Sequence, residues 1–159
     1  MVAALSALVL LSACAKNPGS EPGGLGLGMN ASEGVATPGS SQDFVVNVGD
    51  RVFFETDSTE LTAQSRTTLD RQAQWLNQYS RYAFTIEGHA DERGTREYNI
   101  ALGARRATTV QDYLTSRGIA ANRMRTISYG KERPVAVCDD ISCWSQNRRA
   151  VTVINNAGT

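Results

Sequence analysis

This chain of 159 residues has no excess of either sign of charge, because its 16 basic and 16 acidic residues give a formal net charge of zero. No long run of like charge occurs either. Proteins that bind nucleic acid or an anionic membrane through a basic patch have an excess of lysine and arginine. We therefore predict no nucleic-acid partner and no polybasic membrane contact.

Histidine is nearly absent, and His89 is the single example. A serine or cysteine nucleophile needs a base and a group that orients it, and the chain offers no candidate base other than His89. The surrounding segment EGHAD also allows a metal site. One histidine without a second ligand motif instead favours a structural, hydrogen-bonded role. We expect a protein that is not an enzyme and that has no metal and no cofactor.

No apolar run reaches the roughly 20 residues that span a membrane as a helix. The run in MVAALSALVLLSAC predicts a signal peptide over residues 1–13. No basic residue precedes it, so translation is expected to start upstream of Met1. A buried helix is the alternative, but the glycine-rich stretch that follows leaves it nothing to pack against. The LSAC motif resembles a bacterial lipobox, which predicts cleavage before Cys14 and lipidation of its thiol.

Only three cysteines are present. With Cys14 as the lipid anchor, Cys138 and Cys143 remain as an even pair, which in an exported chain predicts a disulfide. A metal clip is the alternative, but the second pair of ligands that zinc requires is missing. The disulfide closes a short loop, so its stabilisation is expected at or below the usual ~2–4 kcal/mol.

Residues 15–42 are half glycine, proline and serine. Such a composition cannot bury enough apolar surface to offset the entropy lost on ordering. We predict a lipidated cysteine and flexible linker over residues 14–42, with a root-mean-square reach of roughly 30 Å. The folded head is then expected over residues 43–159.

The head is predicted to begin with a β-hairpin. Phe44, Val46 and Val48 alternate before Gly49-Asp50, a pair suited to a tight turn, and RVFFET follows as the second strand.

A helix is predicted next, with Thr62 as its N-cap and with Leu69, Ala73 and Leu76 on one face. A second helix is predicted over residues 95–117, ending at a glycine, and further strands in YAFTIEG, RMRTISYG and RRAVTVIN. Strands that alternate with helices predict an α/β (α+β) sandwich, with one mixed β-sheet packed on two main helices.

An arginine stands where the second helix would be expected to have an apolar residue. Leu102 and Val110 lie one turn on either side of Arg106, on the apolar face, whereas Arg105 lies at the edge of that face. Leaving a buried cation unpaired costs several kcal/mol, so Arg106 needs a partner. The partner is either an internal carboxylate, which makes Arg106 structural, or a bound carboxylate held by the guanidinium fork.

Asp91 follows the predicted strand YAFTIEG, and Gly88 and Gly94 bracket its loop before the second helix. Loops at strand ends beside helix N-termini are common ligand positions, because free backbone N–H groups point outward there. If the Asp91 carboxylate and the Arg106 guanidinium face one ligand, they would suit a zwitterion, such as the ammonium and carboxylate end of an amino acid. The predicted chemistry is binding, without bond cleavage.

The other charged residues near these positions have plainer interpretations. Glu92, Arg93 and Arg96 are expected on a solvated face. Arg148 and Arg149 are expected either at the rim of the site or at a solvated strand end.

Three ordered motifs resemble the OmpA-like domain family: GHADERGTREYNIALGARRA at 88–107, ISYGKERP at 127–134 and NRRAVTV at 147–153. The segment VFFETD at 52–57 matches it more loosely. The resemblance implies an outer-membrane lipoprotein with a periplasmic head that binds the meso-diaminopimelate part of the peptidoglycan stem peptide without hydrolysing it. It also implies TolB as a partner, with other Tol or outer-membrane proteins, in cell division and envelope integrity.

The resemblance implies roles for three residues by motif position. Asp91 matches the family aspartate that takes the ligand ammonium, and Arg106 matches the arginine that takes the ligand carboxylate. Asp57 matches the aspartate that ends the first strand and lines the same pocket. Two further hypotheses stay open: a metal-assisted amidase acting on the same polymer, and a scaffold whose only ligand is another protein.

Overall fold

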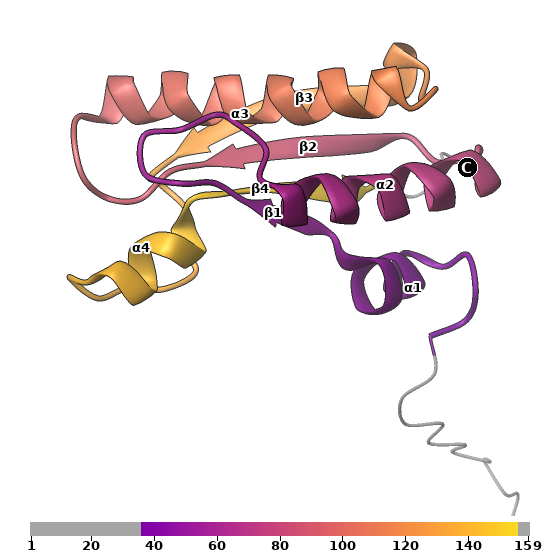
Figure 1. Cartoon of the computed structure of the whole chain (residues 1–159), viewed down its shortest axis with the longest axis horizontal. Coiled ribbons are helices and arrows are strands. Elements are labelled where there is room, and N and C mark those ends of the chain that lie inside the picture. The colour runs from indigo at the N-terminus through magenta and orange to yellow at the C-terminus, as the bar shows by residue number, and fades with distance from the viewer. Residues whose placement is uncertain (1–35, 156–159) are drawn as a thin grey trace, which may run out of the picture. The chain divides into compact units, whose positions relative to one another are not determined.

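The computed structural model describes residues 36–155, which form a mixed sheet with two long helices against one of its faces (Figure 1). The elements in chain order are α1 (Ser41–Asp43), the π-helix η1 (Phe44–Gly49), β1 (Arg51–Phe53), α2 (Ala63–Gln78), β2 (Phe84–His89), α3 (Arg96–Ser116), the 3-10 helix η2 (Ala121–Arg123), β3 (Met124–Gly130), α4 (Ile141–Asn147) and β4 (Arg149–Ile154). The predicted α/β sandwich is confirmed.

The sheet has the strand order β1-β4-β2-β3. Strands β2 and β3 are parallel and are joined through α3, whereas β4 runs antiparallel to both β2 and β1. Val52, Ile86 and Ala150 are buried and belong to one core with side chains of α2 and α3. On the other face of the sheet, Phe53 and Val153 are 45% and 38% exposed. The two long helices therefore cover one face only.

The predicted Thr62 cap of the first long helix and the predicted glycine end of the second are confirmed. The Thr62 hydroxyl accepts a hydrogen bond from the Ser65 amide at 3.1 Å and caps α2. The Thr95 hydroxyl does the same for α3, at 3.2 Å from the Tyr98 amide. The chain leaves α3 through Gly118, whose φ of 89° is the left-handed conformation favoured by glycine after a helix.

The predicted hairpin at the start of the head is wrong, because residues 41–49 are helical. The Phe44 ring is fully buried and meets the Trp75 ring edge-on at 5.0 Å. The Asp43 carboxylate accepts hydrogen bonds at 2.8 Å from the Gly39 amide, the Asn47 side chain and the Trp75 indole. The contacts with Trp75 of α2 override the strand alternation, and the bond from the Gly39 amide places the packed head's first contacts before Asp43.

Two glycines set the distance between α3 and β2. A Cβ atom built on Gly88 would lie 1.8 Å from the Gly103 carbonyl oxygen, and one built on Gly103 would lie 2.8 Å from the Gly88 oxygen. Real Cβ contacts of this length do not occur, so only glycine at both positions allows the backbones to approach this closely. This contact brings the next turn of α3, which carries Arg106, to the end of β2.

Helix α4 lies in the segment that the sequence suggested only as a cystine loop. Cys138 and Cys143 form a disulfide that ties the preceding loop to the first turn of α4.

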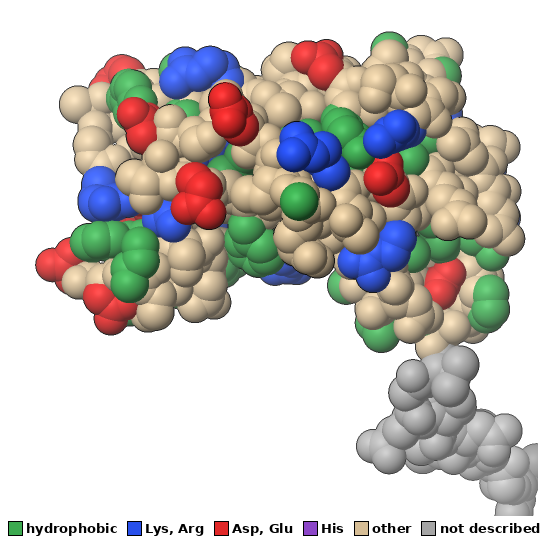
Figure 2. All heavy atoms as spheres, viewed as in Figure 1, with side chains coloured by type: hydrophobic (Ala, Val, Ile, Leu, Met, Phe, Trp, Pro, Cys, Tyr) green, Lys and Arg blue, Asp and Glu red, His purple; other side chains and the backbone are tan. Residues whose placement is uncertain are grey.

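Within residues 36–155, no helix is both long enough and apolar enough to cross a bilayer. Acidic and basic side chains are interspersed on the face shown in Figure 2, in keeping with the zero net charge. The predicted signal peptide, Cys14 and most of the linker lie outside the described residues.

Candidate functional site

Arg106 is fully buried, and its guanidinium is bonded to backbone carbonyls. Its Nε donates to Ser58 O at 2.9 Å, Nη1 to His89 O at 2.8 Å and Nη2 to Glu55 O at 3.1 Å. No aspartate or glutamate of residues 36–155 makes an ion pair with it. The hypothesis of a permanent internal carboxylate partner for Arg106 is therefore wrong.

The guanidinium keeps its charge and part of its donor capacity. Burial, helped by the charge of Arg148, lowers the pKa of Arg106 to about 10, so the side chain is still protonated at neutral pH. A guanidinium has five N–H donors, and three are used by the carbonyls above. Two donors remain for an anion in the adjacent pocket, which Arg106 lines.

The loop that follows β1 carries Asp57 to the same pocket. Glu55 O and Ser58 O, which accept hydrogen bonds from Arg106, hold this loop on both sides of Asp57. Asp57 has a φ of 53°, a conformation that non-glycine residues rarely adopt. The Tyr98 hydroxyl donates a hydrogen bond to its carboxylate. Arg106 thus shapes the loop that presents Asp57.

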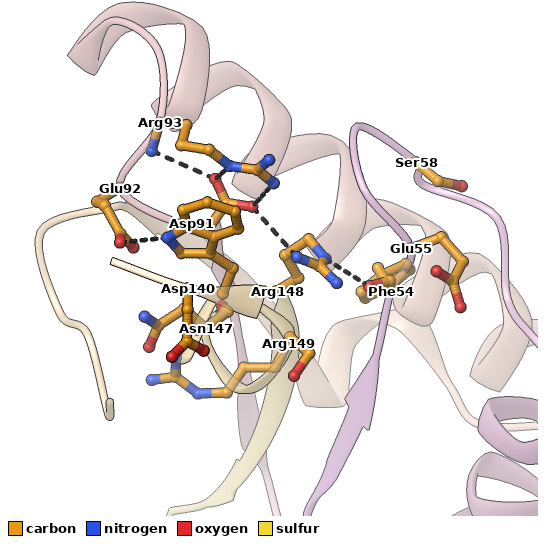
Figure 3. A network of polar contacts seen from close by, with 12 residues as sticks. Phe54, Glu55, Ser58, Asp91, Glu92, Arg93, Asp140, Asn147, Arg148 and Arg149 are labelled. Carbon is orange, nitrogen blue, oxygen red and sulfur yellow. Dashed lines mark hydrogen bonds and ion pairs between the residues drawn. The ribbon is translucent and has the colours of Figure 1, made fainter. Parts of the chain in front are cut away.

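Asp91 lies just beyond β2 and is 8% exposed. Its Oδ2 accepts from Arg93 Nη2 at 2.6 Å and from Arg148 Nη1 at 3.4 Å, and its Oδ1 accepts from Arg93 Nε at 3.1 Å (Figure 3). Burial by itself would raise the pKa of Asp91, but the hydrogen bonds and charge of Arg93 and the bond from Arg148 outweigh it. The pKa of Asp91 therefore lies below its ordinary value, and the carboxylate is ionised.

These three predicted site residues line one pocket of about 270 Å³. The complete lining is Thr56, Asp57, Asp91, Arg93, Gly94, Tyr98, Asn99, Leu102 and Arg106. A larger hollow of about 590 Å³ lies along β1, the start of α2 and α4, and contains none of the three. The smaller pocket is the candidate site, because a buried cation and two carboxylates meet there and can bind both charges of a zwitterion.

Neither interpretation of Arg148 and Arg149 matches the structure, since each is only 4% exposed. Arg148 Nε donates to Phe54 O at 3.0 Å and its Nη1 reaches Asp91. Arg149 Nη2 donates to Arg133 O at 3.2 Å. Both are buried cations that tie the start of β4 to neighbouring segments, and Arg148 contributes to the site through its hydrogen bond to Asp91.

Sequence reasoning also missed Arg93, Tyr98 and Trp144. Arg93 is exposed, as expected, but its guanidinium also pairs with Asp91. Its position two residues after an aspartate in a loop could have indicated this pair. The Trp144 ring lies 4.1 Å from the Arg93 guanidinium carbon, a contact between residues 51 positions apart that no local pattern indicates.

His89 is 1% exposed, and neither of its ring nitrogens has a hydrogen-bond partner. The expected hydrogen-bonded histidine is therefore wrong for the ring, although the His89 carbonyl holds Arg106. Glu87 Oε2 is 3.6 Å from Nε2, too far for a hydrogen bond. Among residues 36–155, no three histidine, cysteine, aspartate or glutamate side chains cluster as metal ligands would.

Acid is expected to weaken the fold through His89. Burial, reinforced by the charges of Arg149 and Arg133, lowers the pKa of His89 from 6.5 to about 4. Between these values the unfolded chain binds a proton that the folded protein does not, so the unfolding free energy falls by up to about 3 kcal/mol as the pH drops from 6.5 to 4.

Urea unfolding at several pH values measures this slope. His89→Leu, which removes the titrating ring from a site where its nitrogens have no partners, is expected to flatten the slope above pH 4.5. Asp43 and Asp91 contribute little to the slope above pH 4.5, because aspartate in the unfolded chain titrates at about 3.9 and the pKa values of both groups in the folded head are lower still. An equally steep slope in His89→Leu would contradict the assignment to His89.

Comparison with known proteins shows which family this chain resembles. The profile described as "OmpA family" matches residues 53–148. The chain is 67% identical over 158 residues to the peptidoglycan-associated lipoprotein of Rhizobium meliloti (strain 1021), covering 98% of this chain and 88% of that protein. The crystal structure of the peptidoglycan-associated lipoprotein from Burkholderia pseudomallei is 36% identical, with a TM-score of 0.68, covering 73% of this chain and 100% of that one. The C-terminal domain of Helicobacter pylori MotB, 23% identical with a TM-score of 0.63, covers 67% of this chain and 84% of that one and shares the fold.

Proposed function

The chain belongs to the OmpA family, and from this membership we propose that it is an outer-membrane lipoprotein whose periplasmic head binds peptidoglycan noncovalently. Its curated relatives are named peptidoglycan-associated lipoproteins. The ligand is the diaminopimelate residue of the stem peptide, which has an ammonium and a carboxylate on one end. The head links the outer membrane to the cell wall.

The single observation that supports this function best is the state of Arg106. It is a buried cation that has three carbonyl partners, no internal carboxylate and an open pocket at its side. Burying a charge without an ionic partner is costly, and a ligand carboxylate would supply that partner. Asp57 and Asp91 on the same pocket are then the acceptors for the ligand ammonium.

The expected affinity of one site is modest. A hydrogen bond to a charged group contributes about 1.5–3 kcal/mol, and the pocket offers only a few of them. Many copies anchored in one membrane face one continuous polymer, so avidity would strengthen the attachment without further contacts.

Lipidated Cys14 would supply the anchor, and mass spectrometry of the native N-terminus can detect its lipid. TolB is the proposed protein partner in the Tol system, to be checked by pull-down.

Sedimentation with purified sacculi tests the proposed function. The wild-type head is expected to pellet with the sacculi, and Asp91→Asn to bind about tenfold more weakly because it loses a charge-assisted contact. Asp70→Asn is the matched control, since Asp70 lies on α2, outside the pocket, and pairs with Arg117.

The same experiment separates the other two hypotheses. Unchanged retention of Asp91→Asn would contradict this site, whereas a wild-type head that does not pellet with the sacculi would support a scaffold that binds only protein. New soluble muropeptides released in a chelator-sensitive manner would contradict a pure binder and support an amidase. Thermal unfolding of each variant shows that it is folded under the conditions of the assay.

A further inference from the structure

The Asp91 carboxylate has no vacant acceptor position in this structure. Its Oδ1 accepts from the Arg93 amide at 3.3 Å and from Arg93 Nε at 3.1 Å. Its Oδ2 accepts from Arg93 Nη2 at 2.6 Å and from Arg148 Nη1 at 3.4 Å. A carboxylate has about four lone-pair positions, so a ligand ammonium can reach Asp91 only if one of these donors leaves.

The two arginines differ in their freedom to leave. The Arg148 side chain is 5% exposed and its Nε is bonded to Phe54 O at 3.0 Å. The Arg93 side chain is 41% exposed, so its guanidinium can move into solvent at little desolvation cost. The backbone of Arg93 is held separately, because its carbonyl accepts a hydrogen bond from Asn99 Nδ2 at 2.7 Å. Only the side chain needs to move.

We infer that the Arg93 side chain is an internal cation that occupies the ammonium position of the pocket and that the ligand amine must displace. This inference rests on the proposed function and adds a specificity-determining residue to it. Arg93 lines the same pocket as Asp91 and Arg106, on the side where an ammonium would meet Asp91. The ammonium position at Asp91 is thus occupied by the protein's own cation until a competing cation arrives, while the rest of the pocket beside Arg106 stays open.

Trp144 of α4 stabilises Arg93 in this position. The guanidinium carbon of Arg93 lies 4.1 Å from the centre of the indole ring, a cation–π contact. The indole is itself held, since its Nε1 donates to Glu92 Oε1 at 2.5 Å. Trp144 follows Cys143, whose disulfide with Cys138 ties the start of α4 to the preceding loop. Helix α4 therefore contacts the guanidinium of Arg93, which lines the pocket, through the ring of Trp144.

The arrangement discriminates between free and acylated amines. A free ammonium replaces one cation on Asp91 by another, so the carboxylate stays paired throughout. An amide nitrogen is uncharged and cannot replace a guanidinium that makes two bonds to a carboxylate. Stem peptides whose diaminopimelate amine is free should therefore bind better than those whose amine is acylated, as in a cross-link.

Calorimetric titration with two soluble ligands tests the inference. One is a stem peptide that ends in meso-diaminopimelate with a free side-chain amine, and the other is the same peptide with that amine acetylated. Arg93→Gln is expected to bind the free-amine peptide about tenfold more tightly than wild type, because the competing cation is gone, and the acetylated peptide with unchanged affinity. Trp144→Leu should shift affinity in the same direction, by about threefold.

Arg96→Gln is the matched control. Arg96 is the next arginine along the chain, its side chain is 65% exposed, and it pairs with Glu132 outside the pocket. Its affinity for both peptides is expected to equal that of wild type. Thermal unfolding should place all variants close to wild type, since the replaced side chains are exposed or partly buried.

Several outcomes would overturn the inference. Equal weakening of both peptides by Arg93→Gln would make Arg93 a ligand contact. Unchanged binding of the free-amine peptide by Arg93→Gln would show that Arg93 does not compete, while the proposed function would stand on wild-type binding. A wild-type head that binds neither peptide would reject the proposed function and this inference together.

Discussion

Arg106→Gln is expected to lose binding of the stem peptide by about a hundredfold or more. The substitution removes the charge of a residue that lines the pocket and the two donors that its carbonyl partners leave unused, and two charge-assisted hydrogen bonds contribute about 3 kcal/mol or more. It also releases Glu55 O and Ser58 O, which hold the loop that presents Asp57. The ligand would thus lose its carboxylate partner directly and part of its ammonium partner indirectly.

The same substitution is expected to lower the unfolding free energy by about 3 kcal/mol. A glutamine can satisfy at most a part of the three carbonyls, and each buried acceptor without a partner costs about 1–3 kcal/mol. Urea unfolding measures this loss, and titration well below the unfolding midpoint measures binding by folded protein only. Arg105→Gln is the control, because Arg105 is exposed on the same turn of α3, and it should leave both quantities within about 0.5 kcal/mol of wild type. A folded Arg106→Gln with wild-type affinity would reject Arg106 as the carboxylate partner.

Gly88→Ala is expected to be the most destabilising single methyl addition in the head. The new Cβ would lie 1.8 Å from the Gly103 carbonyl oxygen and 2.6 Å from the Gly103 carbonyl carbon. Both atoms belong to the backbone of α3, so no side chain can turn aside, and the helix has to move away from β2. A loss of about 4 kcal/mol or more follows, at the extreme of what point substitutions cause.

Thermal unfolding checks this expectation. A loss of that size should lower the midpoint by more than about 10 °C in a domain of this length, or prevent folding altogether. Gly118→Ala is the control: nothing lies within 4 Å of its added Cβ, and only the positive φ of 89° opposes the change. It should cost about 1–2 kcal/mol. Stabilities of the two variants that are alike would contradict the close backbone contact as the cause.

Some features of the head could be predicted because their causes are local. Thr62 and Thr95 cap helices whose first free amides lie three residues away. The buried position of Arg106 follows from its spacing to Leu102 and Val110 on one helix. Asp91 and Arg106 could be placed on one pocket because strand, loop and helix follow each other directly in the chain.

Other features could not be predicted because their causes lie far away in sequence. Residues 44–48 alternate like a strand, yet Asp43 and Phe44 contact Trp75 of α2, more than 30 positions later, and lie in a helical segment. The cation–π contact of Arg93 depends on Trp144 of α4, which lies 51 positions later in the chain. Alternation describes only what a strand would bury, and it is overridden wherever another element buries more.

The sequence by itself determined the class of fold, the two long helices, and the presence of an arginine on the apolar face of the second helix, where a buried cation needs a partner. Only the tertiary structure decided the partners of that arginine, because Glu55, Ser58 and His89 lie 51, 48 and 17 positions away from it. It also decided that Asp91 is already paired in the head described here. Helix propensity and capping act over a few residues, whereas the pairing of buried charges depends on which segments the folded chain places within about 3 Å of each other.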